Sequence, residues 1–167
     1  MTASSGLAHG QPLKSNVYMS RWIRRILISM AIAIVALVAA GPWALHELTL
    51  SNVVGRRARP ALLALSMEEK QAIWESLKEP GPVGVEALTP HAYILGLLGY
   101  REPAPGANVA WFVARDHDGR NLTHPRMAWW HLSGAALTIW LTRNWNTNEL
   151  LAKVAEIRRS RQQPSND

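Results

Sequence analysis

An uncharged stretch near the N-terminus constrains this chain more than any other feature. It reads ILISMAIAIVALVAAGPWAL and runs from Ile26 to Leu45 without Lys, Arg, Asp or Glu. As a helix rising about 1.5 Å per residue, it is long enough to cross the roughly 30 Å hydrocarbon core of a bilayer. The sequence therefore predicts one transmembrane helix, and no later stretch is long enough for a second.

The residues at the two ends of this stretch fit a bilayer interface. Trp22 and Trp43 lie near its ends, where aromatic side chains gather in membrane proteins. Arg24 and Arg25 precede it, whereas Glu47 is the nearest charged residue on the other side. This asymmetry favours a cytoplasmic N-terminus, with the rest of the chain across the membrane.

A cleaved signal peptide is the alternative for the same stretch. The small residues Val38-Ala39-Ala40 would satisfy a cleavage rule. Against cleavage, a long polar region precedes the apolar run, and the run continues past Ala40. An uncleaved anchor is the expectation.

Charge and composition narrow the class of partner. The formal net charge is +6, and basic residues flank the apolar run, with a further cluster at Arg56, Arg57 and Arg59. This placement favours lipid headgroups over nucleic acid. Eight Trp against one Phe also suggests work at an apolar–polar boundary, and the absence of Cys excludes disulfides and thiolate metal sites.

The chain divides into one anchor and one small domain. The fold class expected is mostly α, with a single N-terminal transmembrane helix followed by a helical extramembrane domain. Residues 47–65 are either a helical extension of the anchor near the headgroups or a solvated linker. The expected parts are a flexible tail at 1–20, the anchor at 21–46, the juxtamembrane segment at 47–65, the helical domain at 66–161 and a disordered tail at 162–167.

Three helix starts in the domain are marked locally. Ser66 and Asn146 are each followed three residues later by Glu, the pattern of a capping box. Thr89 precedes a proline that suits the first helical position. The expected helices are 66–79, 89–99, 125–144 and 147–161, with 109–116 an apolar element of ambiguous type and 117–125 a polar turn region around Asp118-Gly119.

The stretch HLSGAALTIWLT, from His131 to Thr142, resembles a membrane span but is too short to be one. Arg143 closes it before the next helix begins. It is therefore predicted to be a buried core helix. The small residues 133–136, Ser-Gly-Ala-Ala, should allow a neighbouring helix to approach closely.

Candidate chemistry is sparse. His117, His124 and His131 recur every seven residues, a step of about 10.5 Å along a helix, too far for a shared zinc with bonds of about 2.1 Å. No metal site or cofactor is expected. Asp116 and Asp118, which flank His117, could support a general base, but as turn residues they are expected to be solvated.

Two arginines end apolar elements and have two possible roles. Arg115 and Arg143 could bind a phosphate or lipid headgroup, or they could favour a helix C-terminus.

The C-terminal third carries a family resemblance. HLSGAALTIWLTRNWNTNELLAKV, from His131 to Val154, is similar in rhythm to the pattern R-K-L-K-E-A-L-L-A-L-E-L-E-R-x-Y-S-K-D-E-I-L of bacterial cell-wall transglycosylases, glycosyltransferase family 51. PGANVAWFVARD, which ends at Asp116, resembles that family's G-G-S-T-I-T-Q-Q-L-A-K-N. The resemblance covers roughly residues 106–155. It implies a single-pass inner-membrane protein whose periplasmic helical domain polymerises lipid-linked disaccharide.

The residues that carry this chemistry in the family are not matched. There, one Glu acts as general base, and a second acidic residue with cationic groups helps the pyrophosphate to leave. Gly134 stands at the second position here, and the motif of the first, E-D-x-x-F-x-x-H-x-G, does not occur. Glu86, five residues before His91, is the remaining candidate for a base.

Two functional hypotheses follow. The first is a non-catalytic, membrane-anchored helical module of the bacterial cell envelope that binds a partner protein or membrane lipid. The alternative is an active enzyme on a lipid-linked glycan. An enzyme needs a buried carboxylate in a cleft, so the placement of Glu86, Glu102, Asp116 and Asp118 discriminates between them.

Overall fold

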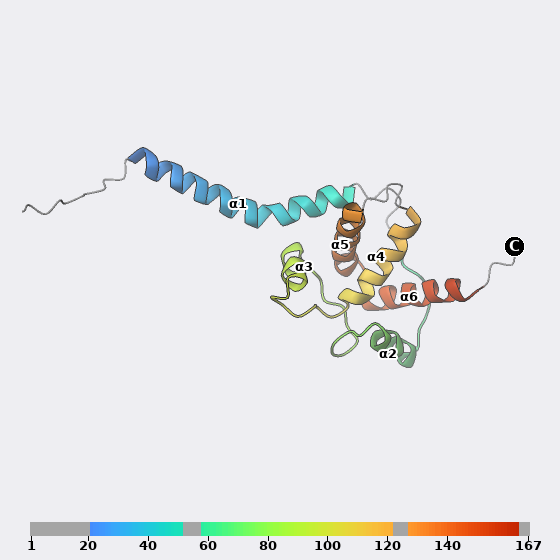
Figure 1. The fold of residues 1–167 in the computed structure, drawn as a ribbon. Helices are drawn as coiled ribbons and strands as arrows, with labels where there is room; N and C mark the ends of the chain where they lie inside the picture. Colours follow the sequence, from blue (N-terminus) through green and yellow to red (C-terminus); the bar gives the residue numbers. More distant parts are fainter. Residues whose placement is uncertain (1–20, 52–57, 122–126, 164–167) are drawn as a thin grey trace, which may run out of the picture. The chain divides into compact units, whose positions relative to one another are not determined.

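The computed structural model describes residues 21–51, 58–121 and 127–163. Within these ranges the chain forms six α-helices and no strand (Figure 1). The predicted fold class, all-helical with one N-terminal candidate membrane helix, is confirmed. The helices are α1 (Arg21–Ser51), α2 (Met67–Ser76), α3 (Pro90–Leu97), α4 (Ala107–Asn121), α5 (Met127–Asn144) and α6 (Thr147–Gln162).

Among the described residues, α1 is the helix long and apolar enough to cross a membrane. The chain divides into two compact units, Met1–Val38 and Ala39–Asp167, so the last turns of α1 belong with the domain. There His46 and Thr49 are buried. The helix continues beyond the predicted end of the anchor to Ser51, and residues 52–57 lie outside the described part.

The core of the second unit is built around α4. This helix packs against both α5 and α6, while α2 lies on α6 and α3 on α5. Because each helix presents one apolar face to a neighbour, the shared centre excludes water. Its fully buried side chains include Trp74, Val109, Val113, Leu137, Leu141, Leu150, Leu151 and Val154.

Gly134 sets the distance between α4 and α5. A Cβ atom at this position would lie 2.6 Å from Cζ3 and 2.9 Å from Cη2 of the Trp111 ring. Ser133 and Ala136 beside it are buried. The predictions of a buried helix and of close approach at its small residues are confirmed.

The three locally marked helix starts are also confirmed. The side chains of Ser66 and Asn146 each accept a hydrogen bond from the backbone of the third helical residue, whose Glu side chain accepts one in return. Thr89 caps α3, and its side chain accepts from the N–H of Ala92 at 3.1 Å. Farther along, Thr142 on α5 accepts from the N–H of Leu88 at 3.1 Å, which fixes the entry of α3 against α5.

The start of α4 has a different, long-range cause. The buried Glu79 carboxylate accepts hydrogen bonds from the N–H groups of Gly106, at 3.0 Å, and Val109, at 2.8 Å. These groups belong to the first turn, where helical N–H groups have no partner within the helix and where negative charge is favoured. Gly106 has φ +83°, and a Cβ there would lie 2.6 Å from Val85, so only glycine fits this turn.

Two sequence-based expectations in this region need correction. The apolar element at 109–116 is helical, and the turn predicted around Asp118-Gly119 is wrong because α4 continues through both residues to Asn121. Asp118 is buried instead of solvated. Its carboxylate packs against α5, and that contact outweighs the turn propensity of the dipeptide. The predicted helix start at Pro125 lies outside the described residues, and α5 begins at Met127.

Candidate functional site

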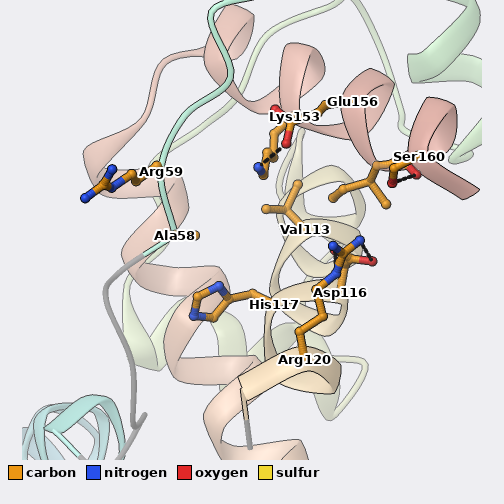
Figure 2. Close-up of a pocket in the computed structure, with 10 residues that line it drawn as sticks. Ala58, Arg59, Val113, Asp116, His117, Arg120, Lys153, Glu156 and Ser160 are labelled. Atoms are coloured by element: carbon orange, nitrogen blue, oxygen red, sulfur yellow. Dashed lines mark hydrogen bonds and ion pairs between the residues drawn. The ribbon is translucent and has the colours of Figure 1, made fainter.

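A polar pocket of about 240 Å³ lies between α4 and α6. Figure 2 shows its polar side chains coming from both helices and from the segment before α2. His117 on α4 is half-buried, and burial, with Lys153 nearby, holds the pKa of its imidazole below the usual value, against a smaller opposing effect of Asp116. The lining residues are Ala58, Arg59, Val113, Asp116, His117, Arg120, Lys153, Glu156, Ile157 and Ser160.

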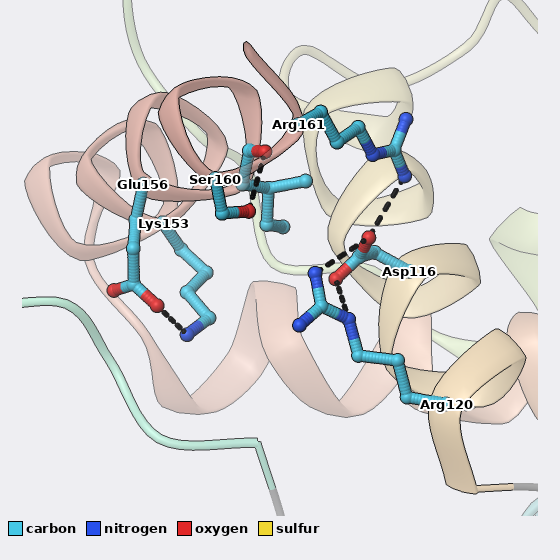
Figure 3. A network of polar contacts seen from close by, with 7 residues as sticks. Asp116, Arg120, Lys153, Glu156, Ser160 and Arg161 are labelled. Carbon is cyan, nitrogen blue, oxygen red and sulfur yellow. Dashed lines mark hydrogen bonds and ion pairs between the residues drawn. The ribbon is translucent and has the colours of Figure 1, made fainter. Parts of the chain in front are cut away.

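Two cations of this pocket, Arg120 and Lys153, are paired with its own carboxylates (Figure 3). Asp116 is 3.0 Å from Arg120 Nε and 2.8 Å from Arg161 Nη2, and the Lys153 ammonium is 2.6 Å from Glu156 Oε1. The Asp116 carboxylate is thus occupied by two guanidinium groups, and the Lys153 ammonium by one carboxylate. Of these ion pairs, the one between Asp116 and Arg161 joins α4 to α6.

A larger and mostly apolar cavity, of about 470 Å³, lies between α3, α4 and α5. Its buried wall includes Leu88 and Ala104, and the Trp111 ring forms part of its α4 side. The residues that line it are Leu88, Ala92, Tyr93, Gly96, Leu97, Arg101, Glu102, Pro103, Ala104, Ala107, Asn108, Trp111, His131, Leu132 and Ala135. Its size falls in the range of about 300–1,000 Å³ that is typical of small-ligand sites.

A second apolar crevice, of about 120 Å³, adjoins this cavity and reaches the end of α1. The cavity and the crevice share four lining residues on α3 and α5: Tyr93, Leu97, Leu132 and Ala135. On its other side the crevice is lined by Pro42 and Leu45, which fall in the predicted membrane span. An apolar path therefore connects the last turns of α1 with the interior of the domain.

The outer side of α3 exposes large apolar side chains next to this path. Leu97 is 78%, Leu98 61% and Tyr100 80% exposed, and Ile94 and Leu95 are partly exposed. Contiguous exposed apolar residues of this kind mark binding surfaces or membrane contacts.

The arginines predicted to contact phosphate lie apart from one another. Arg115 stacks over the Trp130 ring at 4.9 Å, and Arg143 over the Trp43 ring at 5.2 Å, so each is used in a cation–π contact. Arg59 lines the polar pocket, where Figure 2 shows its guanidinium directed away from Asp116 and Arg120. Arg56 and Arg57 lie outside the described residues.

The other predicted site residues are on the surface. Glu86 is exposed in the loop before α3, and its carboxylate lies 3.6 Å from Arg101 Nη2. Trp22, Arg24 and Arg25 are exposed on α1, as membrane-interface residues would be in the absence of lipid. Among the described predicted site residues, Arg143 and Trp43 are brought together, whereas Glu86 and Arg115 have other partners.

Sequence reasoning named Asp118 but missed its burial against α5. Ser133 Oγ on α5 donates a hydrogen bond of 2.8 Å to its Oδ2, and Oδ1 is buried without a hydrogen-bond partner among the described residues. Burial raises the pKa of Asp118, against the smaller opposing effect of the Ser133 hydroxyl. The spacing Ala110, Ala114, Asp118 could have revealed this, since three buried residues four apart share one helix face.

The fold and cavities define a helical protein with one candidate membrane helix and an apolar recess in its domain. Comparison with protein-family models, with curated proteins and with solved structures finds no match for this chain.

Proposed function

We propose that this chain is a single-pass, non-catalytic module of the bacterial cell envelope whose domain lies on the membrane surface and binds lipid. The observation that carries the proposal is the place of α3. Leu97 is largely exposed on this helix and also lines the crevice whose far wall is Pro42 and Leu45 of the predicted span. A helix that lines the same crevice as the end of the predicted span is expected to lie near the depth of the lipid surface.

Transfer of the exposed apolar side chains at the end of α3 from water into lipid is favourable in free energy. The exposed side chains at the end of α3 and just after it, Leu97, Leu98 and Tyr100, gain roughly 1.5–3 kcal/mol each when a Leu-sized group leaves water completely. An interfacial helix buries such a face to a depth of roughly 5–10 Å in the headgroup region. The tyrosine suits this depth, because its ring is apolar and its hydroxyl can remain wet.

The arrangement in the membrane follows from the flanking charges. Arg24 and Arg25 before the apolar run favour a cytoplasmic N-terminus, and in this orientation the domain is on the periplasmic side of the inner membrane. We propose that the anchor is retained, because a long polar region precedes the apolar run and the run continues past Ala40.

The proposal that the chain is non-catalytic is supported by the surroundings of Gly134. If the transglycosylase resemblance is a true relationship, this is the place of the second catalytic acid, and Trp111 leaves no room there even for a methyl group. Glu86, the candidate for the first, is exposed and near Arg101 instead of in a cleft. The chain is therefore proposed to be a degenerate relative of the transglycosylases that kept the helix packing and lost the catalytic carboxylates.

The membrane contact can be tested by site-specific fluorescence, because the chain has no cysteine of its own. Leu97→Cys and Leu98→Cys are labelled with an environment-sensitive dye in the full chain, reconstituted in lipid nanodiscs with lipids that carry a quencher on the acyl chain. We expect both dyes to be quenched. The matched control is Ala72→Cys, which is exposed on α2 and should not be quenched. Equal quenching at all three positions, or none, contradicts the proposal.

The enzyme alternative has two observations in its favour. The Asp116 carboxylate lines the polar pocket, and the Asp118 carboxylate is buried, although it does not line that pocket. Its test is polymerisation by the purified full chain in detergent, supplied with lipid-linked disaccharide. We expect no glycan longer than the substrate. Longer chains would refute the non-catalytic proposal, and their loss in Asp116→Asn or Glu86→Gln would identify the base.

A further inference from the structure

We propose that the cavity between α3, α4 and α5 holds one acyl chain of a membrane phospholipid, which enters along the crevice beside α1. This inference rests on the proposed function, since it needs the domain at the lipid surface. It goes further in assigning an interior site to a single chain of defined chemistry.

The distribution of polarity in the cavity suits a hydrocarbon chain with a polar head. The inner wall is apolar and buried at Leu88 and Ala104. The polar lining residues Glu102, Asn108 and His131 are exposed, so they lie at the mouth. A chain bound here buries its methylenes, at roughly 0.8 kcal/mol each, and leaves its headgroup in water.

Small side chains create the space. Gly96 on α3, Ala107 on α4 and Ala135 on α5 face the same cavity from three helices. No ordinary core requires an opening of this size, because interiors pack with few voids larger than a water molecule. An open, mostly apolar cavity with a few polar groups at its mouth is the kind of site that accepts a mostly apolar ligand.

The position of the crevice indicates where the bound acyl chain comes from. The crevice that adjoins the cavity is lined on one side by Pro42 and Leu45, and it meets the cavity at Leu97 and Leu132. A chain entering here comes from the bilayer in which α1 is embedded. Phospholipid is the chain-bearing molecule at the highest concentration there, so mass action favours it over free fatty acids or scarce lipids.

Photo-crosslinking of the full chain in nanodiscs tests this directly. The probe is a phosphatidylethanolamine with a diazirine near the end of one acyl chain. Trypsin cleaves the labelled chain into peptides that distinguish the parts of the site. The peptide 79–101 contains α3, the peptide 102–115 contains the cavity side of α4, and the peptide 26–56 contains the anchor. We expect labelling of all three, with the α4 label at Ala107 or Trp111.

Two variants block the cavity in different ways. Ala135→Phe fills the space shared by cavity and crevice. Gly96→Leu is the second, and it should fold, because a Cβ there meets its nearest atom, the Arg101 carbonyl oxygen, at 3.9 Å without positive φ. Each should lower the α4 label by about tenfold, since each displaced methylene forfeits a factor of roughly four in binding. Ala72→Phe, exposed on α2, should leave it unchanged.

The outcomes separate this inference from the proposed function. Label on α3 at Leu97 or Leu98 without label on residues 102–115 would overturn the cavity site and leave the surface contact standing. Label on the anchor alone would overturn both. An α4 label that survives in both blocking variants, or that forms better with a diazirine fatty acid at equal concentration, would also overturn the assignment.

Discussion

Replacing Gly134 with alanine tests the close approach of α4 and α5. The added Cβ would lie 2.6 Å from a ring atom of Trp111, a distance that real Cβ contacts do not show, so the ring or the helix must move. Overpacking of a core costs roughly 1–3 kcal/mol. Alanine also gains about 1 kcal/mol over glycine in helix propensity. We expect a net loss of about 1 kcal/mol in the free energy of unfolding.

Gly119→Ala is the matched control, because this glycine also lies in a helix but has no atom within 4 Å of an added Cβ. There only the propensity gain applies, and stability should rise by about 0.5–1 kcal/mol. The two alanine substitutions should therefore differ by about 2 kcal/mol. Gly134→Leu extends the series and should cost more than Gly134→Ala.

The assay is urea unfolding of the full chain in mild detergent, followed by circular dichroism of the helices. A double-mutant cycle with Trp111→Leu identifies the cause, since removing the ring should convert Gly134→Ala from a loss into a gain. Equal stabilisation by Gly134→Ala and Gly119→Ala would refute the close approach. A Gly134→Ala loss that persists without the Trp111 ring would mean that another contact is responsible.

Three further predictions use the same unfolding assay. Because burial raises the pKa of Asp118, its contribution to stability is complete below an unfolded pKa of about 3.9 and is lost as pH rises through the folded pKa. Wild type should therefore lose stability relative to Asp118→Asn as pH rises above about 4, and a pH-independent difference would contradict this. Glu79→Ala should lower the free energy of unfolding by roughly 1–3 kcal/mol, because it leaves buried N–H groups of α4 without an acceptor. The exposed Glu75→Ala is the control and should change stability by less than about 0.5 kcal/mol; similar costs for both would mean that Glu79 is not the cap. Asn146→Ala should cost about 1 kcal/mol through loss of the α6 capping box, and unchanged stability would show that α6 is held by packing alone.

The sequence predicted those helices whose starts are encoded locally. Ser66, Thr89 and Asn146 cap their own helices through contacts three residues away, so a short window contains the whole signal. The buried character of α5 was equally predictable, because an uncharged segment too short to span a membrane has to be covered by protein.

The beginning and the C-terminal part of α4 could not be predicted in the same way. Its N-terminal cap is Glu79, which precedes the helix by a whole loop and α3, and no local pattern contains that contact. Near its other end, Asp118-Gly119 has strong turn propensity, but the Ser133 hydroxyl on α5 binds the carboxylate and the helix continues. Tertiary contacts override local preference at both places.

The candidate site could not be predicted from the sequence, because it is a cavity formed by helix packing and not a sequence motif. Gly96, Ala107 and Ala135 are individually ordinary small residues on three helices, and only their packing shows that they face one cavity. The arginines were recognised as unusual, but their positions over Trp130 and Trp43 depend on contacts between separate segments.

The remote cap of α4 has a consequence for the order in which the domain assembles. Because α2 and α6 carry complete capping boxes, each can begin to form before its neighbours are in place. The first turn of α4 gains its acceptor only when Glu79 has been brought to it, which requires closure of the intervening chain. Amide hydrogen exchange should therefore link the opening of α4's first turn to loosening of the segment just after α2. This central helix would then be completed late in folding, although it touches more of the core than any helix that starts by itself.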